Sequence, residues 1–140
     1  MNQVKTYAGK NAWWLILVIG LYNVCPIIIF YNNLDILNIW WIILGVFYYG
    51  FNLVWIPILI RNKIELYDNY FILYYGFQKE RININDIIQI EKSHNPIAAT
   101  ANSIDRIYIK TKNRELYISL KNNDNFIKEI LNKKMLLLKK

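Results

Sequence analysis

The sequence has few of the residues that build disulfide frameworks, metal centres or phosphate-binding loops. It contains one cysteine, Cys25, so it cannot form an internal disulfide. It also contains one histidine, His94, and no Cys/His cluster that could hold zinc. The five glycines form no phosphate-binding pattern. We therefore expect no cofactor and no metal ion.

The sequence also lacks a recognisable catalytic constellation. Asp86, His94, Asp105 and Glu115 could in principle meet as acid and base, but nothing in their spacing predicts that they do. Most charged residues on alternating strands are simply solvated. His94 is most simply a loop residue. The sequence therefore favours a protein that is not an enzyme.

Charged residues are absent from two long stretches near the N-terminus. Residues 11–31 and 36–60 contain no Asp, Glu, Lys or Arg, and each stretch matches the roughly 20 apolar residues that cross a bilayer. A signal peptide is the rival interpretation of the first stretch, but it would have a shorter apolar core and a small-residue cleavage site. We therefore expect residues 1–60 to form two transmembrane helices.

The two expected helices should form a hairpin, because only residues 32–35 separate them. Lys5 and Lys10 precede the first helix, and Arg61 and Lys63 follow the second, whereas the short connection carries one acidic residue. Basic flanks favour the cytoplasmic side of a membrane. The sequence thus predicts a multi-pass protein of the cell membrane with both termini in the cytoplasm.

Polar and aromatic residues in these stretches also suit a bilayer. Asn23, Asn38 and Asn52 should hydrogen-bond across the helix pair or within an oligomer. Pro26 removes a backbone donor and should bend the first helix. Tryptophan and tyrosine, which favour the headgroup level, cluster near the ends of both stretches. They are Trp13, Trp14, Tyr31, Trp40, Trp41 and Trp55.

From residue 61 onward the pattern changes to short alternating segments separated by turns. Such segments predict antiparallel strands, many of them linked as hairpins. Asn122 or Asn123 can cap a closing helix, in which Phe126 and Ile130 lie on one apolar stripe. Residues 61–140 therefore form one small domain with its own core. The six expected strands are residues 63–67, 70–75, 78–84, 86–91, 104–111 and 114–120.

This order of elements is typical of a PH-like barrel, and one segment sharpens that interpretation. Residues 95–106 read NPIAATANSIDR and lead into an alternating strand. The segment resembles the YyaB-like family of bacterial PH-like membrane proteins, to which the immunity protein for the bacteriocin sublancin is also similar. The resemblance covers roughly residues 64–131. The positions that carry it are Pro96, Ala98, Ala101, Ser103, Asp105 and Arg106.

The resemblance implies an α+β membrane protein. A transmembrane helical hairpin should be followed by a small PH-like antiparallel β-barrel or sheet, which a C-terminal helix closes. Asp105 and Arg106 are neighbours on a strand and point to opposite faces, so each should hold a loop or a neighbouring strand in place. Pro96 can end a strand, Ala101 allows close packing, and Ser103 can bond local backbone. We therefore interpret the motif as structural.

The segment from residue 61 onward holds most of the 17 Lys and Arg residues and is basic. An anionic leaflet attracts a tethered basic domain by ~1 kcal/mol per well-placed Lys or Arg. The same charge could instead serve only to keep this segment on the cytoplasmic side of the membrane. Because the charge is scattered and tethered to a membrane, a nucleic-acid partner is not expected. The candidates for lipid-surface contacts are Arg61, Lys63, Lys139 and Lys140.

Two functions remain open. The resemblance implies a bacteriocin self-immunity protein that acts without catalysis at the cell membrane, with the bilayer and a bacteriocin peptide or its membrane target as partners. The alternative is a membrane-tethered PH-like interaction module that binds anionic lipid or a membrane-protein partner. Membership of an oligomer or a larger membrane complex is compatible with both.

Overall fold

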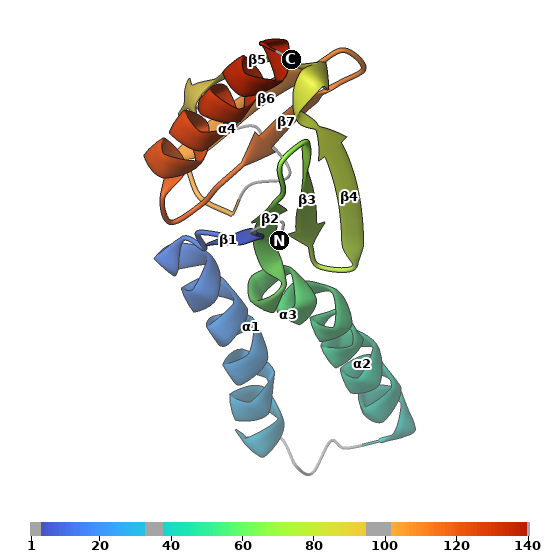
Figure 1. Cartoon of the computed structure of the whole chain (residues 1–140). Coiled ribbons are helices and arrows are strands. Elements are labelled where there is room, and N and C mark those ends of the chain that lie inside the picture. The colour runs from blue at the N-terminus through green and yellow to red at the C-terminus, as the bar shows by residue number, and fades with distance from the viewer. Residues whose placement is uncertain (1–3, 33–37, 95–101, 140) are drawn as a thin grey trace.

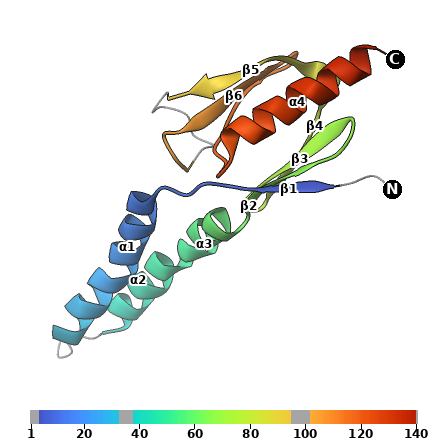
Figure 2. The same cartoon turned by 60° about the vertical axis from the view of Figure 1, so that its left-hand side comes forward.

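The computed structural model describes residues 4–32, 38–94 and 102–139. A β-rich domain lies at one end of the molecule, and helices project together from one side of it (Figure 1). The C-terminus lies at the end of the β domain that is remote from these helices, as both views show (Figures 1 and 2).

Two helical stretches are long and apolar enough to cross a membrane. Helix α1 spans Trp13–Asn32, close to the predicted residues 11–31. The second stretch consists of α2 (Ile39–Gly50) and α3 (Asn52–Ile60), and Phe51 between them keeps a helical backbone, with φ −61° and ψ −22°. None of the residues in these helices is buried by the rest of the chain. The predicted start of the second stretch, at residue 36, lies outside the described residues.

A strand that the sequence did not predict precedes the first helix. Strand β1 (Lys5–Ala8) pairs antiparallel with β2 (Asn62–Leu66), so that Ala8 lies opposite Lys63. Only Tyr7 of β1 enters the core, where it is 6% exposed. One inward side chain gives no alternating pattern, which is why the strand escaped the sequence analysis. The helices are thus an insertion between two neighbouring strands of one sheet.

The described strands form two antiparallel sheets. The first has the order β1-β2-β3-β4, with β3 at Tyr70–Tyr75 and β4 at Gln78–Asn83. The second has the order β5-β6-β7. Its strands are β5 (Ile87–Ser93), β6 (Arg106–Thr111) and β7 (Glu115–Ile118). All six strands predicted after residue 60 are therefore present, with ends shifted by a few residues.

The predicted fold needs one correction, because the described strands do not close into a barrel. A single bridge between Gly9 and Leu120 joins the sheets on one side, extended by a hydrogen bond from Lys10 N to Ser119 O (2.9 Å). On the other side, β4 and β5 are joined only through the short helix η2 (Ile84–Asp86), and no ladder between them is formed. Alternation along a strand predicts which of its faces is buried, but it does not predict whether the sheets close into a barrel.

The core lies between the sheets and is covered by α4 (Asn123–Leu138), which packs against β5, β6 and η2 (Figure 2). Phe126 of α4 is fully buried and makes edge-on contacts with the rings of Tyr7 and Phe71, at centroid distances of 5.2 and 5.6 Å. Asn122 occupies the N-cap position without a side-chain cap bond, whereas the Asn123 side chain accepts from Leu120 N (2.9 Å). The predicted closing helix is confirmed, and it starts at one of the two expected cap residues, Asn122, although that side chain makes no cap bond.

Candidate functional site

A cluster of hydrogen-bonded asparagines joins the helices to the β domain. The Asn11 amide donates to Leu59 O at the end of α3 (2.8 Å) and accepts from Asn102 Nδ2 (2.8 Å). Asn62 also donates to Asn11 (3.2 Å), and the Tyr75 hydroxyl donates to Asn102 Oδ1 (2.7 Å). The start of α1, the end of α3 and the β domain therefore share one polar network, with no flexible linker between them.

Two glycines allow the close approach of backbone at this junction. Gly9 N donates to Asn62 O (2.7 Å), and a Cβ on Gly9 would overlap the Asn62 side chain. Gly76, at φ 57°, forms the β3–β4 turn, and its N–H donates to Arg61 O (2.9 Å). A Cβ on Gly76 would lie 3.0 Å from Ile58 Cγ1. The β3–β4 turn is therefore held against the last turn of α3.

Beside this turn, three cations converge on one aromatic ring. Arg61 Cζ lies 5.2 Å from the Tyr74 ring centroid, Lys63 Nζ 5.0 Å and Lys79 Nζ 5.6 Å. The register explains this geometry, because Lys63 and Lys79 are the cross-strand partners of Tyr74 on either side. Arg81 extends the cluster over the Tyr70 ring, at 3.8 Å. We call Arg61, Lys63, Tyr74, Lys79 and Arg81 the basic sheet face.

Glu65 is the one acidic residue at the outward positions of β2, β3 and β4, strands that the structure describes in full. Its carboxylate accepts from Lys63 Nζ (2.7 Å) and from the Tyr74 hydroxyl (3.1 Å). The hydrogen bond from Lys63 holds the pKa of Glu65 below its ordinary value. The face therefore keeps a net positive charge at neutral pH.

The four predicted lipid contacts do not gather in one place. Arg61 and Lys63 belong to the basic sheet face. Lys139 follows the far end of α4, remote from the helices α1 to α3 (Figures 1 and 2), and Lys140 lies outside the described residues. Sequence reasoning missed Tyr74 and Lys79. Their contact depends on the β3–β4 register, which the Gly76 turn fixes.

The described part of the family-like motif ties separate elements together. Asp105 accepts from Lys10 Nζ (2.9 Å) ahead of α1 and from Asn123 Nδ2 (2.9 Å) at the start of α4. Arg106 is buried and donates to Ser103 O. Pro96, Ala98 and Ala101 lie outside the described residues. The contacts of Asp105 and Arg106 are those of residues that hold strands and loops in place.

Inside the helix pair, two tyrosines complete a broken hydrogen-bond ladder. Pro26 has no N–H, so the Tyr22 carbonyl four residues earlier lacks its usual helical donor. The Tyr48 hydroxyl donates to that carbonyl (2.8 Å), and the Tyr22 hydroxyl donates in return to Tyr48 O. The two rings stack with centroids 4.0 Å apart. The Tyr48 hydroxyl therefore supplies the donor that Pro26 cannot provide.

Two of the three asparagines discussed above for these helices also bond across the pair. Asn23 and Asn52 exchange hydrogen bonds of 3.2 and 2.6 Å between their side-chain amides. Tyr49 adds a bond from its hydroxyl to Asn23 O (3.0 Å). Asn38 instead caps α2, and its side-chain oxygen accepts from the backbone amides two and three residues on, at 3.1 Å (Trp40) and 3.3 Å (Trp41). The expectation of interhelical bonds is thus met by Asn23 and Asn52.

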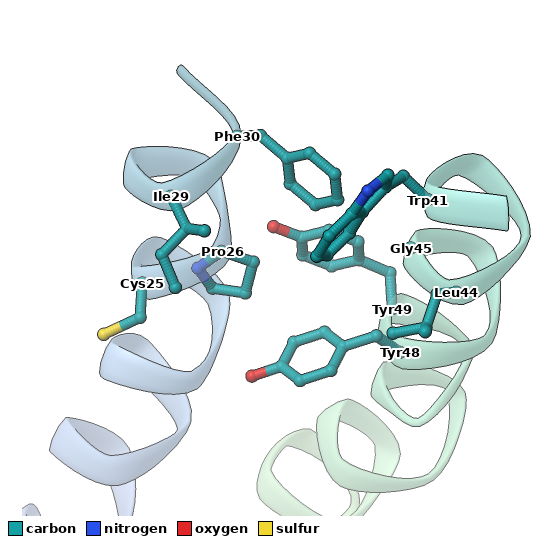
Figure 3. Close-up of a pocket in the computed structure, with 9 residues that line it drawn as sticks. All are labelled: Cys25, Pro26, Ile29, Phe30, Trp41, Leu44, Gly45, Tyr48 and Tyr49. Carbon is teal, nitrogen blue, oxygen red and sulfur yellow. The ribbon is translucent and has the colours of Figure 1, made fainter. Parts of the chain in front are cut away.

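Next to these hydrogen bonds, α1 and α2 line a half-open apolar cavity of about 230 Å³ (Figure 3). Phe30 and Trp41 meet edge-on across it, with centroids 5.9 Å apart. Gly45 leaves part of its wall without a side chain. The lining residues are Cys25, Pro26, Ile29, Phe30, Trp41, Leu44, Gly45, Tyr48 and Tyr49.

Among known proteins, a family model described as a bacterial PH domain matches residues 62–134. The match begins with β2 and ends within α4, so it leaves out β1 and both helical stretches. No curated protein and no solved structure matches the chain. Within the described residues, no group of three or more His, Cys, Asp or Glu side chains could hold a metal ion.

The Asp105 contacts predict a pH-dependent contribution to stability. The Lys10 ammonium lowers the pKa of the Asp105 carboxyl below its unfolded value of about 3.9. The stabilisation is therefore complete above about pH 5 and is lost as the pH falls through the unfolded pKa towards the lower, folded pKa. Asp105→Asn should lower the unfolding midpoint of the detergent-solubilised chain at pH 7. The difference from the wild type should shrink as the pH falls below 4.

Asp124→Asn is the matched control, because its ion pair with Lys92 is well exposed and such pairs contribute little. A constant difference between Asp105→Asn and the wild type from pH 7 to pH 2.5 would contradict a stabilising role for the Asp105 charge.

Proposed function

Because the chain belongs to the bacterial PH domain family, we propose that it is a non-catalytic interaction module that two transmembrane helices hold at the inner face of the cell membrane. PH-like domains generally bind partners and do not catalyse reactions, and the family match indicates no enzyme class. The finer parts of this proposal, membrane insertion and orientation, come from the hydrophobic stretches and their basic flanks.

The proposal rests on the way the helices are joined to the β domain. The chain leaves the first sheet at Ala8, passes through both helical stretches and re-enters the same sheet at Asn62. If the helices span a bilayer, the β domain must then lie directly at one membrane surface. Lys10 and Arg61 flank the helices at this same end, which favours the cytoplasmic side.

Cysteine labelling tests the orientation. In a Cys25→Ser background, Asn113→Cys places a thiol in the exposed β6–β7 turn. A membrane-impermeant maleimide should label this thiol only after the cells are permeabilised. Asn33→Cys, in the predicted outer connection, is the control and should be labelled in intact cells. Labelling of Asn113→Cys in intact cells would overturn the proposal.

Bacteriocin self-immunity is a second candidate, and the cavity between α1 and α2 is the observation that favours it. Its walls are apolar, and it lies in the part of the helix pair that is remote from the β domain (Figures 1 and 3). A cavity of this kind suits an apolar side chain of a membrane-active peptide. The sequence resemblance to a family that also resembles an immunity protein points the same way.

Expression in a bacteriocin-sensitive strain tests this second function. The wild-type chain should protect cells from its cognate peptide. Gly45→Leu should abolish protection, because the new side chain fills the cavity towards Phe30, whose Cζ lies 3.8 Å from the added Cβ. Gly20→Leu is the matched control in α1, where a Cβ meets no atom within 4 Å, and it should still protect. Unchanged killing across the candidate peptides would count against immunity.

A further inference from the structure

We propose that the basic sheet face binds the phosphate groups of anionic phospholipids in the leaflet next to the β domain. This inference rests on the proposed function, since it requires the helices to span the membrane. It adds a defined site, in which Arg61, Lys63 and Lys79 around Tyr74 hold the headgroups.

The position of the cluster relative to α3 places it at headgroup depth. Arg61 follows α3 directly, and its carbonyl accepts from Gly76 N in the β3–β4 turn. Lys63 lies two residues from Arg61 and Lys79 lies three residues from Gly76, which at ~3.3 Å per residue is about 7 Å and about 10 Å. Each headgroup region is roughly 5–8 Å deep. Lysine side chains can span the remaining distance while their stems lie along the sheet.

Apolar side chains at the same level complete an interfacial surface. Phe77, at the tip of the β3–β4 turn, is 72% exposed, and Ile60, at the end of α3, is 79% exposed. The Gly76 contact with Ile58 keeps the turn against the helix, so both side chains lie at the junction. An aromatic ring beside cations is the composition that membrane interfaces favour.

The charge of the face favours an anionic occupant. Within the described residues, Arg61 and Lys79 have no carboxylate partner within 4 Å, and the Tyr74 ring holds both cations on one side of the sheet. Lys63 pairs with Glu65 (2.7 Å), so these two charges offset each other and the excess positive charge around Tyr74 lies on Arg61 and Lys79. Phosphate oxygens from the bilayer can pair with these cations. A soluble acidic partner would have to enter between the face and the leaflet.

Lipid binding to the full-length chain tests the inference. The chain is purified in mild detergent and titrated with phosphatidylglycerol or phosphatidylcholine, and bound lipid is counted by native mass spectrometry. Phosphatidylglycerol should bind more tightly. Each of Arg61→Gln, Lys63→Gln and Lys79→Gln should weaken that binding about five-fold. Glu65→Gln should strengthen it by up to about five-fold, which separates a charge effect from a loss of folding.

The control removes positive charge from α4 and from the residue that follows it. The double variant Lys128→Gln, Lys139→Gln should retain the preference for phosphatidylglycerol, and inorganic phosphate at millimolar concentration should not compete. Equal binding of the two lipids would overturn the inference, as would an equal loss in the control or competition by inorganic phosphate. These outcomes would not contradict the proposed function if the maleimide still fails to label Asn113→Cys in intact cells.

Discussion

The pairing of β1 with β2 is the constraint on which the rest of this structure depends. Adjacent strands lie about 4.8 Å apart, so the chain must return to almost the same place after passing through both helical stretches. The helices are therefore antiparallel neighbours, whatever their surroundings. The same pairing explains why the asparagine cluster and the Lys10–Asp105 contact can form, since both need residues before α1 to lie beside the β domain.

The hydrogen bonds inside the helix pair follow from that constraint. With their ends fixed together, α1 and α2 bring the backbone defect at Pro26 opposite Tyr48. Proline leaves the Tyr22 carbonyl without its helical donor, and the Tyr48 hydroxyl supplies a replacement. The Asn23–Asn52 pair acts in the same way for side-chain amides. The helices thus contribute a specific interface. The cavity beside it is lined by Pro26 and by Gly45, which has no side chain.

The sequence predicted most of the helices and strands, but it did not predict how they pair with one another. Alternation predicted the strands from β2 to β7 because each buries one face, and the apolar stripe through Phe126 predicted α4. Strand β1 was missed because Tyr7 alone reaches the core. Of the predicted barrel or sheet, only the barrel was wrong, because alternation does not predict whether β4 and β5 pair and close it. The basic sheet face was found only in part, since Tyr74 and Lys79 join it through a register that no single segment encodes.

A disulfide across the first sheet tests the central claim most directly. Thr6 and Glu65 are opposite partners in the β1–β2 register, and such pairs have Cα separations of about 4.5–5.5 Å, within the range that a disulfide spans. In a Cys25→Ser background, Thr6→Cys with Glu65→Cys should cross-link within one molecule under mild oxidation in native membranes. Thr6→Cys with Lys79→Cys, two strands further away, should not. Failure of the first pair to close, or cross-links only between molecules, would contradict a hairpin inserted between paired strands.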